Sequence, residues 1–149
     1  MTTQTITAAA RDAAPAAAIT DEDRAAIAAL PQRVVAAWAA QDADAFAEVF
    51  TPDGTMIIPG VFQQGREAIR SFLAQAFQGP FKGTRVTGTP VDLRFAGAES
   101  GILITRGGIL APGESEPSAE RAVNASWVVI KRDGRWLLAA YQNSPRNAA

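Results

Sequence analysis

The apolar residues of this chain change their spacing near residue 81, and this change constrains the fold more than any other feature. Before it, apolar residues recur every three or four positions, which is the period of an amphipathic helix. After it, they alternate with polar residues, which is the period of a half-buried β-strand. Helices are therefore expected first and a run of antiparallel strands after them. This α+β order predicts helices packed on one face of a curved sheet.

The first helix is expected to begin after Thr20, because threonine is a favoured N-cap residue. The three acidic residues that follow it suit the positive end of the helix dipole. An apolar stripe then continues to Trp38. Pro31 falls inside this stripe and lacks the amide hydrogen that a helix interior uses, so it is expected to kink the helix or split it in two.

Two further helices and one short strand are expected before residue 81. Asp42 or Asp44 can cap a short second helix, and residues 66–77 have the spacing of a third. Between them, residues 51–54 have the composition of a turn, and residues 55–58 are predicted to form a strand.

Four strands are expected in the second half of the chain, namely 84–95, 101–110, 119–131 and 135–143. Pro90 predicts a bulge or an edge position in the first of them. Asp133-Gly134, between two apolar runs, is a strong hairpin signal. Residues 111–118 are rich in Pro, Gly, Ser and Glu, and are predicted to be an exposed loop.

The composition indicates one domain of ordinary size. The chain has 149 residues and a formal net charge of -1, with acids and bases interspersed, so no nucleic acid and no membrane surface is expected as a partner. Residues 1–18 are predicted to be a flexible N-terminal tail, 19–146 the folded domain and 147–149 a C-terminal tail. With no cysteine and no export signal, a cytoplasmic location is expected.

The chain contains no histidine and no cysteine, and this excludes most common catalytic sites. A Ser-His-Asp triad, a Cys-His pair and a zinc site of the usual ligands cannot be built from it. It also has no phosphate-binding glycine motif, so neither a metal nor an organic cofactor is expected.

Five segments carry a family resemblance: 37–38, 42–46, 50–54, 65–69 and 127–138. Together they resemble the NTF2-like superfamily, of the SnoaL-like and ketosteroid isomerase kind, over about residues 20–146. Three more segments, 83–90, 107–110 and 141–146, resemble its SgcJ/EcaC-type group. That group includes small proteins encoded with the iterative polyketide synthases that make enediyne antibiotics.

The resemblance implies a cone-shaped α+β fold. A curved, mostly antiparallel sheet would pack on three N-terminal helices around a deep pocket, and a homodimer would form through the sheets. It does not imply an activity, because isomerases, cyclases, dehydratases and binding modules share this scaffold. In ketosteroid isomerase the catalytic groups are an Asp base, a Tyr and a protonated Asp. Those positions fall on Ile58, near Val34 and near Ser126 or Trp127, so all three groups are missing.

Some polar side chains could still contact a ligand. Tyr141, the only tyrosine, either orients a ligand carbonyl or is an ordinary strand aromatic. Arg121 either binds a carboxylate, a phosphate or an enolate, or is a solvated strand end. Asn124, Gln142 and Asn143 either line the pocket or lie on the face that forms the dimer, because a shift of one residue exchanges the faces.

The apolar walls of the pocket are expected to come from large side chains of both halves of the chain. They are Trp38, Met56, Ile58, Phe62, Phe72 and Trp127. So many apolar groups favour an apolar ligand.

Three functions remain compatible with these residues. The first is an accessory protein of enediyne-type polyketide biosynthesis that binds an apolar intermediate and shields or shapes it. The second is a cyclase, dehydratase or isomerase acting on that intermediate. The third is a docking module for a polyketide synthase.

Overall fold

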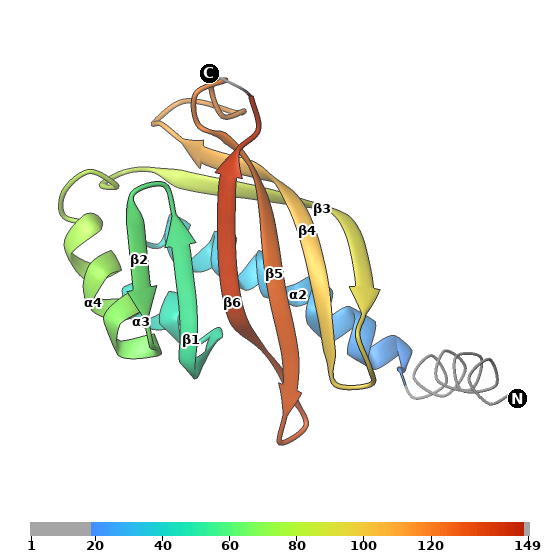
Figure 1. Cartoon of the computed structure of the whole chain (residues 1–149). Helices are drawn as coiled ribbons and strands as arrows, with labels where there is room; N and C mark the ends of the chain where they lie inside the picture. The colour runs from blue at the N-terminus through green and yellow to red at the C-terminus, as the bar shows by residue number, and fades with distance from the viewer. Residues whose placement is uncertain (1–18, 148–149) are drawn as a thin grey trace, which may run out of the picture.

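The computed structural model describes residues 19–147, which form one six-stranded sheet with helices on one side of it (Figure 1). The sheet order is β2-β1-β6-β5-β4-β3. All neighbours are antiparallel except β1 and β6, which are parallel. The strands are β1 (Phe50–Ile58), β2 (Val61–Gln64), β3 (Arg85–Phe95), β4 (Ser100–Leu110), β5 (Ala122–Arg132) and β6 (Arg135–Pro145). The predicted tail at 1–18 and the last two residues lie outside the described part.

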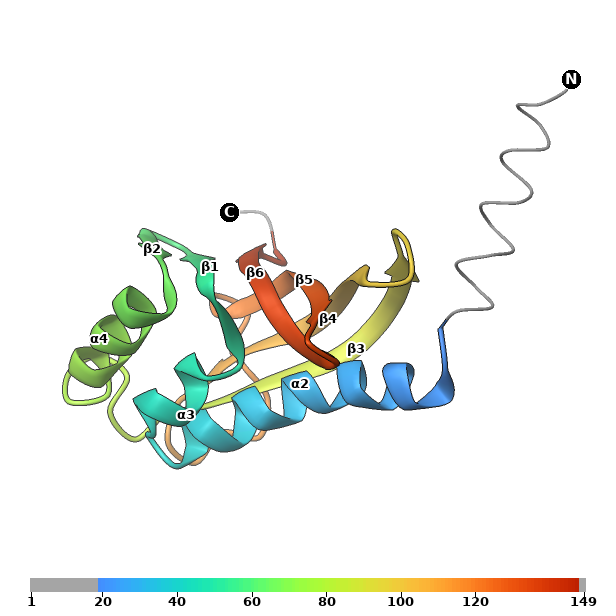
Figure 2. The ribbon, with the colours of Figure 1, turned by 90° about the horizontal axis from the view of Figure 1, so that it is seen from below.

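Three helices cover the concave side of the sheet (Figure 2). The long helix α2 (Asp21–Ala39) runs beneath the sheet and contacts both β3 and β6. The short α3 (Ala43–Ala47) packs against both α2 and α4 (Arg66–Ala76), and α4 packs on β1 and β2. The α+β class, the curved sheet and the helical first half are therefore confirmed.

Helix α2 begins as the sequence predicts, and its first turn also fastens it to the sheet. Thr20 is the N-cap: its Oγ1 accepts from the N–H of Asp23 at 3.0 Å, and its own N–H donates to Asp23 Oδ2 at 3.0 Å. Asp23 Oδ1 accepts from Lys131 Nζ and Trp136 Nε1, both at 3.0 Å. One carboxylate thus joins the start of α2 to the hairpin of β5 and β6.

Of the two outcomes expected at Pro31, a kink or a split of the first helix, the split is wrong. Helix α2 is one element from Asp21 to Ala39, with Pro31 inside it. Ile27, Leu30 and Trp38 on the same helix are at most 6% exposed. Burial of this stripe contributes more than the hydrogen bond that proline removes, so packing overrides the local preference.

Residues 51–54 do not form a separate turn but belong to an irregular β1. The pairing of β1 with β6 shifts between Phe50 and Thr55, which shows where the extra residues are accommodated. Thr51 is fully buried there, and its hydroxyl donates to Asp53 Oδ1 at 2.9 Å. The turn residues predicted here therefore make a bulge inside a strand.

Strand β2 was not expected. It is only four residues long and folds back on β1 through Pro59-Gly60, where Gly60 has a φ of 78°. A four-residue strand carries too little alternation to be recognised by its period.

The remaining strand predictions are confirmed. Pro90 lies on an edge strand and next to a register shift, so both predicted roles apply. Asp133 and Gly134 connect β5 to β6 with φ values of 51° and 77°, as a tight hairpin turn requires. The predicted loop at 111–118 joins β4 to β5.

Strands β3 and β4 approach unusually closely at Gly107. A Cβ atom at this position would lie 1.9 Å from the carbonyl oxygen of Thr87 and 3.0 Å from the Cα of Gly88. Gly107 and Gly88 are register partners, and the missing side chain of Gly107 lets the two backbones meet here. The close approach shapes the wall of the cavity described next.

Candidate functional site

A cavity of about 320 Å³ lies between α2 and the concave face of the sheet. Helix α2 contributes one wall, and β1, β3, β4, β5 and β6 contribute the other. Its volume lies in the range of small-molecule sites, and its lining is mainly aliphatic and aromatic. The cavity is therefore the candidate functional site.

Four of the predicted apolar wall residues line this cavity, namely Trp38, Met56, Ile58 and Trp127. The two indole rings are held in place by hydrogen bonds. Trp38 Nε1 donates to Thr84 Oγ1, and Trp127 Nε1 donates to Thr105 Oγ1, each at 2.9 Å. Both walls thus carry rigid aromatic surfaces.

Phe62, Phe72 and Asn124 do not line the cavity, contrary to expectation. Phe62 is 61% exposed because it pairs with Ile57 on the convex face. Phe72 lies on α4 and packs against Phe81, with 6.3 Å between the ring centroids. Phe81 lines the cavity, so Phe72 forms a second layer behind it. Asn124 is exposed because the alternation of β5 turns it away from the cavity.

Tyr141 and Asn143 form the part of the polar wall that β6 contributes. They share one face of β6, and Asn143 Nδ2 donates to the Tyr141 hydroxyl at 3.0 Å. Burial raises the pKa of Tyr141, although the hydrogen bond from Asn143 opposes the shift. Gln142 lies between them and is exposed on the opposite face. Of the three amide side chains predicted to lie either in the pocket or on the opposite face, only Asn143 faces the cavity.

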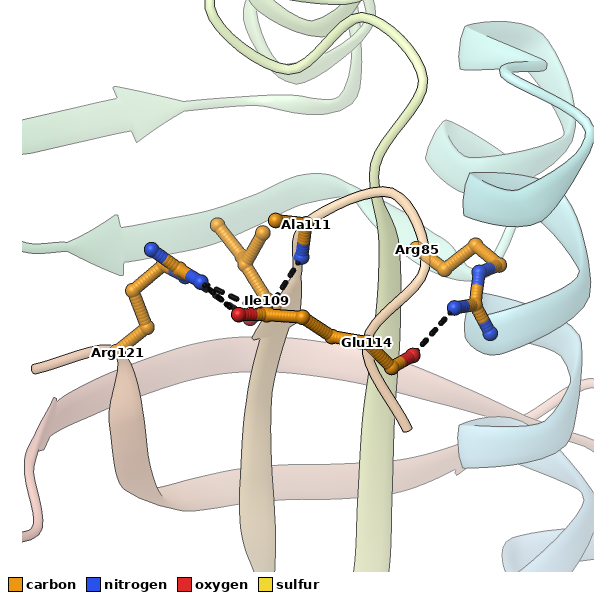
Figure 3. A network of polar contacts seen from close by, with 5 residues as sticks. All are labelled: Arg85, Ile109, Ala111, Glu114 and Arg121. Carbon is orange, nitrogen blue, oxygen red and sulfur yellow. Dashed lines mark hydrogen bonds and ion pairs between the residues drawn. The ribbon is translucent and has the colours of Figure 1, made fainter. Parts of the chain in front are cut away.

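Arg121 lies at the cavity wall but already has a carboxylate partner (Figure 3). Its Nη2 bonds both carboxylate oxygens of Glu114, at 2.7 and 2.9 Å, and its Nε donates to the carbonyl of Ile109 at 3.3 Å. Arg85 binds the backbone carbonyl of Glu114 at 2.6 Å. Arg121 therefore holds the 111–118 loop beside the cavity, a role that its sequence position did not suggest.

Glu114 is the centre of this loop network. The N–H of Ala111 donates to it at 2.8 Å, and this bond, together with the Arg121 guanidinium, lowers the pKa of Glu114 below its usual value. The carboxylate therefore remains ionised at neutral pH, and the loop is held by charge-assisted hydrogen bonds.

Glu114→Gln is expected to loosen residues 111–118, because the amide keeps the size of the side chain but loses one acceptor oxygen and the charge. Hydrogen exchange followed by mass spectrometry at neutral pH should show faster exchange in this loop than in the unchanged protein. Glu116→Gln is the matched control, because Glu116 is exposed and has no ion pair among the described residues. Equal exchange in the two variants would contradict this role.

The cavity contains little that could act as a base. Among the described residues that line it, Glu120 is the only carboxylate, and its side chain is exposed. Ile58, where ketosteroid isomerase has its base, presents a hydrocarbon surface. Within residues 19–147 no group of three His, Cys, Asp or Glu could hold a metal ion, and no helix is long and apolar enough to cross a membrane.

Several residues of the cavity wall, Thr105 and Val34 among them, were not predicted from the sequence. Thr105 anchors Trp127 and is 2% exposed, and Val34 lies directly on the wall. Thr105 shares the alternation of the buried Leu103 in β4, which was the available signal. Val34 belongs to the apolar stripe predicted for this helix, but the stripe alone did not indicate that Val34 lines a cavity.

A curved sheet that encloses an apolar cavity against a long helix defines the NTF2-like class, also described as a cystatin-like fold. The chain belongs to the SnoaL-like domain family, whose model matches residues 20–142. The superfamily resemblance is thereby confirmed, whereas the narrower enediyne-associated group stays a prediction.

Solved structures support the fold. A domain of unknown function from Nostoc punctiforme superposes with a TM-score of 0.80 at 29% identity, over 87% of this chain and 80% of its own. A protein of unknown function from Mycobacterium tuberculosis gives 0.69 at 21% identity, over 85% and 73%. A putative aromatic ring hydroxylase from Novosphingobium aromaticivorans gives 0.65 at 21% identity, over 87% and 92%. No curated protein matches the chain.

Proposed function

We propose that this protein is an accessory protein of enediyne-type polyketide biosynthesis that binds an apolar polyketide intermediate in its cavity. The observation that carries the proposal is the cavity itself: its walls are aliphatic and aromatic, and its one carboxylate is exposed. Membership of the SnoaL-like domain family supports a ligand-binding role on this scaffold.

The segments that resemble the enediyne-associated group also support the proposal, because all three contribute to the cavity wall. Residues 86–88 come from the first, 107–109 from the second, and 141, 143 and 145 from the third. These segments lie on β3, β4 and β6 and meet only in the folded protein. A resemblance concentrated at the ligand site is what a shared ligand class would produce.

The walls suit an extended, conjugated ligand. Trp38 packs edge-on against Phe46 and Phe77 at centroid distances of 5.9 and 5.3 Å, and Trp127 packs edge-on against Tyr141 at 5.1 Å. Rings that are already ordered bind flat apolar surfaces with little further loss of entropy. Binding in this cavity would restrict the conformations of a reactive chain and exclude water from it.

Val34→Phe is expected to weaken binding about tenfold or more, because the larger ring occupies cavity space and displaces apolar ligand contacts. The probe is a phenyl-substituted conjugated triene, with its affinity measured by tryptophan quenching and checked by native mass spectrometry. Val128→Phe is the matched control, since Val128 is 36% exposed and is not part of the cavity wall. Absence of triene binding to the unchanged protein, or equal binding by the two variants, would overturn the proposed site.

A second candidate is a cyclase, dehydratase or isomerase acting on the same intermediate. The observation that favours it is the Tyr141 hydroxyl, which lies inside the cavity and stays protonated, so it could act as an acid. The binding experiment also tests this candidate. Recovery of the bound triene with a changed mass or double-bond pattern would favour the enzyme, and recovery of the triene unchanged would favour the binding role.

A further inference from the structure

The cavity is apolar and closed at one end and open at the other. Phe46, Phe50 and Leu138, at most 5% exposed, form the closed end. The exposed lining residues are Pro59, Glu120 and Pro145. They lie just after β1, just before β5 and at the end of β6, and the strand pairing brings these three places to one edge of the sheet. A ligand with one polar end would therefore leave that end at this edge, the mouth of the cavity.

Arg121 is the cation of this mouth. It continues the alternation of Val123 and Trp127, so its side chain lies on the cavity face of the sheet. Two of the three nitrogen atoms of its guanidinium are already bonded, Nη2 to the carboxylate of Glu114 and Nε to the carbonyl of Ile109. These bonds fix the plane of the guanidinium before any ligand arrives.

The third nitrogen, Nη1, is free to bind a ligand. It has no hydrogen-bond partner among residues 19–147, and Figure 3 shows it pointing away from Glu114. The side chain of Arg121 is 39% exposed, and Nη1 is not one of the enclosed, unpaired polar atoms of the described chain. An oxygen at the mouth can therefore reach its two N–H groups, which bind acceptors only.

Glu114 decides which oxygen fits there. Its ionised carboxylate bonds the same guanidinium through both oxygens and balances its charge. Glu120 brings a second negative charge to the mouth, and Arg121 is the only cation among the described residues that line the cavity. A ligand carboxylate at Nη1 would lie close to like charges and lose part of its hydration. A neutral carbonyl oxygen can accept the same hydrogen bonds without that cost.

We propose that Arg121 binds the carbonyl oxygen of an acyl chain whose acid group is blocked as an ester or a thioester, and that Glu114 disfavours the free acid. The apolar chain would lie inside the cavity, and the blocking group would extend from the mouth into solvent. This inference rests on the proposed function and narrows its ligand class: a polyketide chain that is still attached at its acyl end, rather than the hydrolysed acid or a pure hydrocarbon.

The test compares three probes built on one phenyl-substituted conjugated triene, which end in a methyl ester, a free carboxylate or a methyl ether. The ether has the length of the ester but lacks its carbonyl oxygen. The affinity of each probe is measured at neutral pH by tryptophan quenching and checked by native mass spectrometry. Ester against ether tests the role of Arg121, and ester against carboxylate tests that of Glu114.

The unchanged protein should bind the ester about fivefold or more tightly than the ether, which corresponds to one hydrogen bond. Arg121→Met should bind the two probes equally, because methionine keeps an apolar side chain but has no donor. Arg85→Met is the matched control. Arg85 belongs to the same loop network through the backbone carbonyl of Glu114, but it is not part of the cavity wall, so this variant should keep the preference.

The unchanged protein should bind the carboxylate about fivefold or more weakly than the ester. Glu114→Gln should close this gap, because the charge of Arg121 is then free to attract the carboxylate. The ester, measured in the same variant, reports any general effect of a looser loop. Glu116→Gln is the matched control, because it removes an exposed charge from the same loop and should keep the gap.

Two results for each residue would overturn the proposal. For Arg121 they are equal binding of ester and ether by the unchanged protein, or an ester preference that survives in Arg121→Met. For Glu114 they are a carboxylate that binds as tightly as the ester, or a gap that Glu114→Gln leaves unchanged. In each case the triene still binds and the proposed function stands. Failure of all three probes to bind would overturn the proposed function as well.

Discussion

A Gly107→Ala variant is expected to lose the local pairing of β3 with β4 and to melt roughly 10 °C or more below the unchanged protein. The added methyl group would lie 1.9 Å from the Thr87 carbonyl oxygen, where no carbon atom can be placed. Its obstacle is backbone rather than a flexible side chain, so the strands must separate by about an ångström or more. We expect a cost of about 3 kcal/mol or more, measured as the shift in thermal unfolding followed by circular dichroism.

Gly88→Ala is the matched control for this prediction. Gly88 is the register partner of Gly107, yet its added Cβ would meet only the Thr105 side chain, at an ordinary 3.8 Å. The same chemical change on the two sides of one residue pair should therefore give very different stabilities. Similar melting temperatures for the two variants would show that the close approach of β3 and β4 is absent in solution.

The second large effect is expected at Asp23. Asp23→Asn should lower the melting temperature at pH 7, because the charge that binds Lys131 Nζ is removed and the amide cannot accept from all of the present donors. Asp23 is 5% exposed and connects α2 to both strands of the β5–β6 hairpin. Loss of its charge therefore weakens the contact between α2 and this hairpin, which lie far apart in the sequence. Asp21→Asn is the control, since Asp21 lies on the same helical turn with an exposed side chain.

The pH dependence provides an independent readout of the same contact. The Thr20 N–H, then Trp136 and Lys131, lower the pKa of Asp23 in the folded protein below its usual range. A carboxylate whose pKa is depressed by folding adds stability above its unfolded pKa of about 4, and this stability is lost as the pH falls further. The melting temperature should therefore fall more steeply below about pH 4 in the unchanged protein and in Asp21→Asn than in Asp23→Asn. Parallel curves for all three would contradict the assignment.

Features set by one or two neighbouring residues could be predicted from the sequence. The cap at Thr20, the hairpin at Asp133-Gly134 and the edge bulge at Pro90 depend on local conformational preferences, and all three are present. Pro31 shows the limit of such reasoning. Its local preference is outweighed by burial that involves the whole helix and the sheet above it.

The candidate site was only partly predictable, because its composition depends on strand register. Asn124 and Asn143 look alike in the sequence, yet one is exposed on the convex face and the other lines the cavity. The pairing of Arg121 with Glu114 depends on how an irregular loop folds back, and no periodic pattern reports it. Asp23 meets partners more than 100 residues away, which only the tertiary fold brings together.

The central position of β6 has a consequence for how the two parts of the sheet depend on each other. Within the sheet, hydrogen bonds connect β2 and β1 to β5, β4 and β3 only through residues 135–145. The same residues carry Tyr141 and Asn143 at the cavity wall. Local unfolding of this one strand would therefore divide the sheet into two parts and open the cavity in the same step.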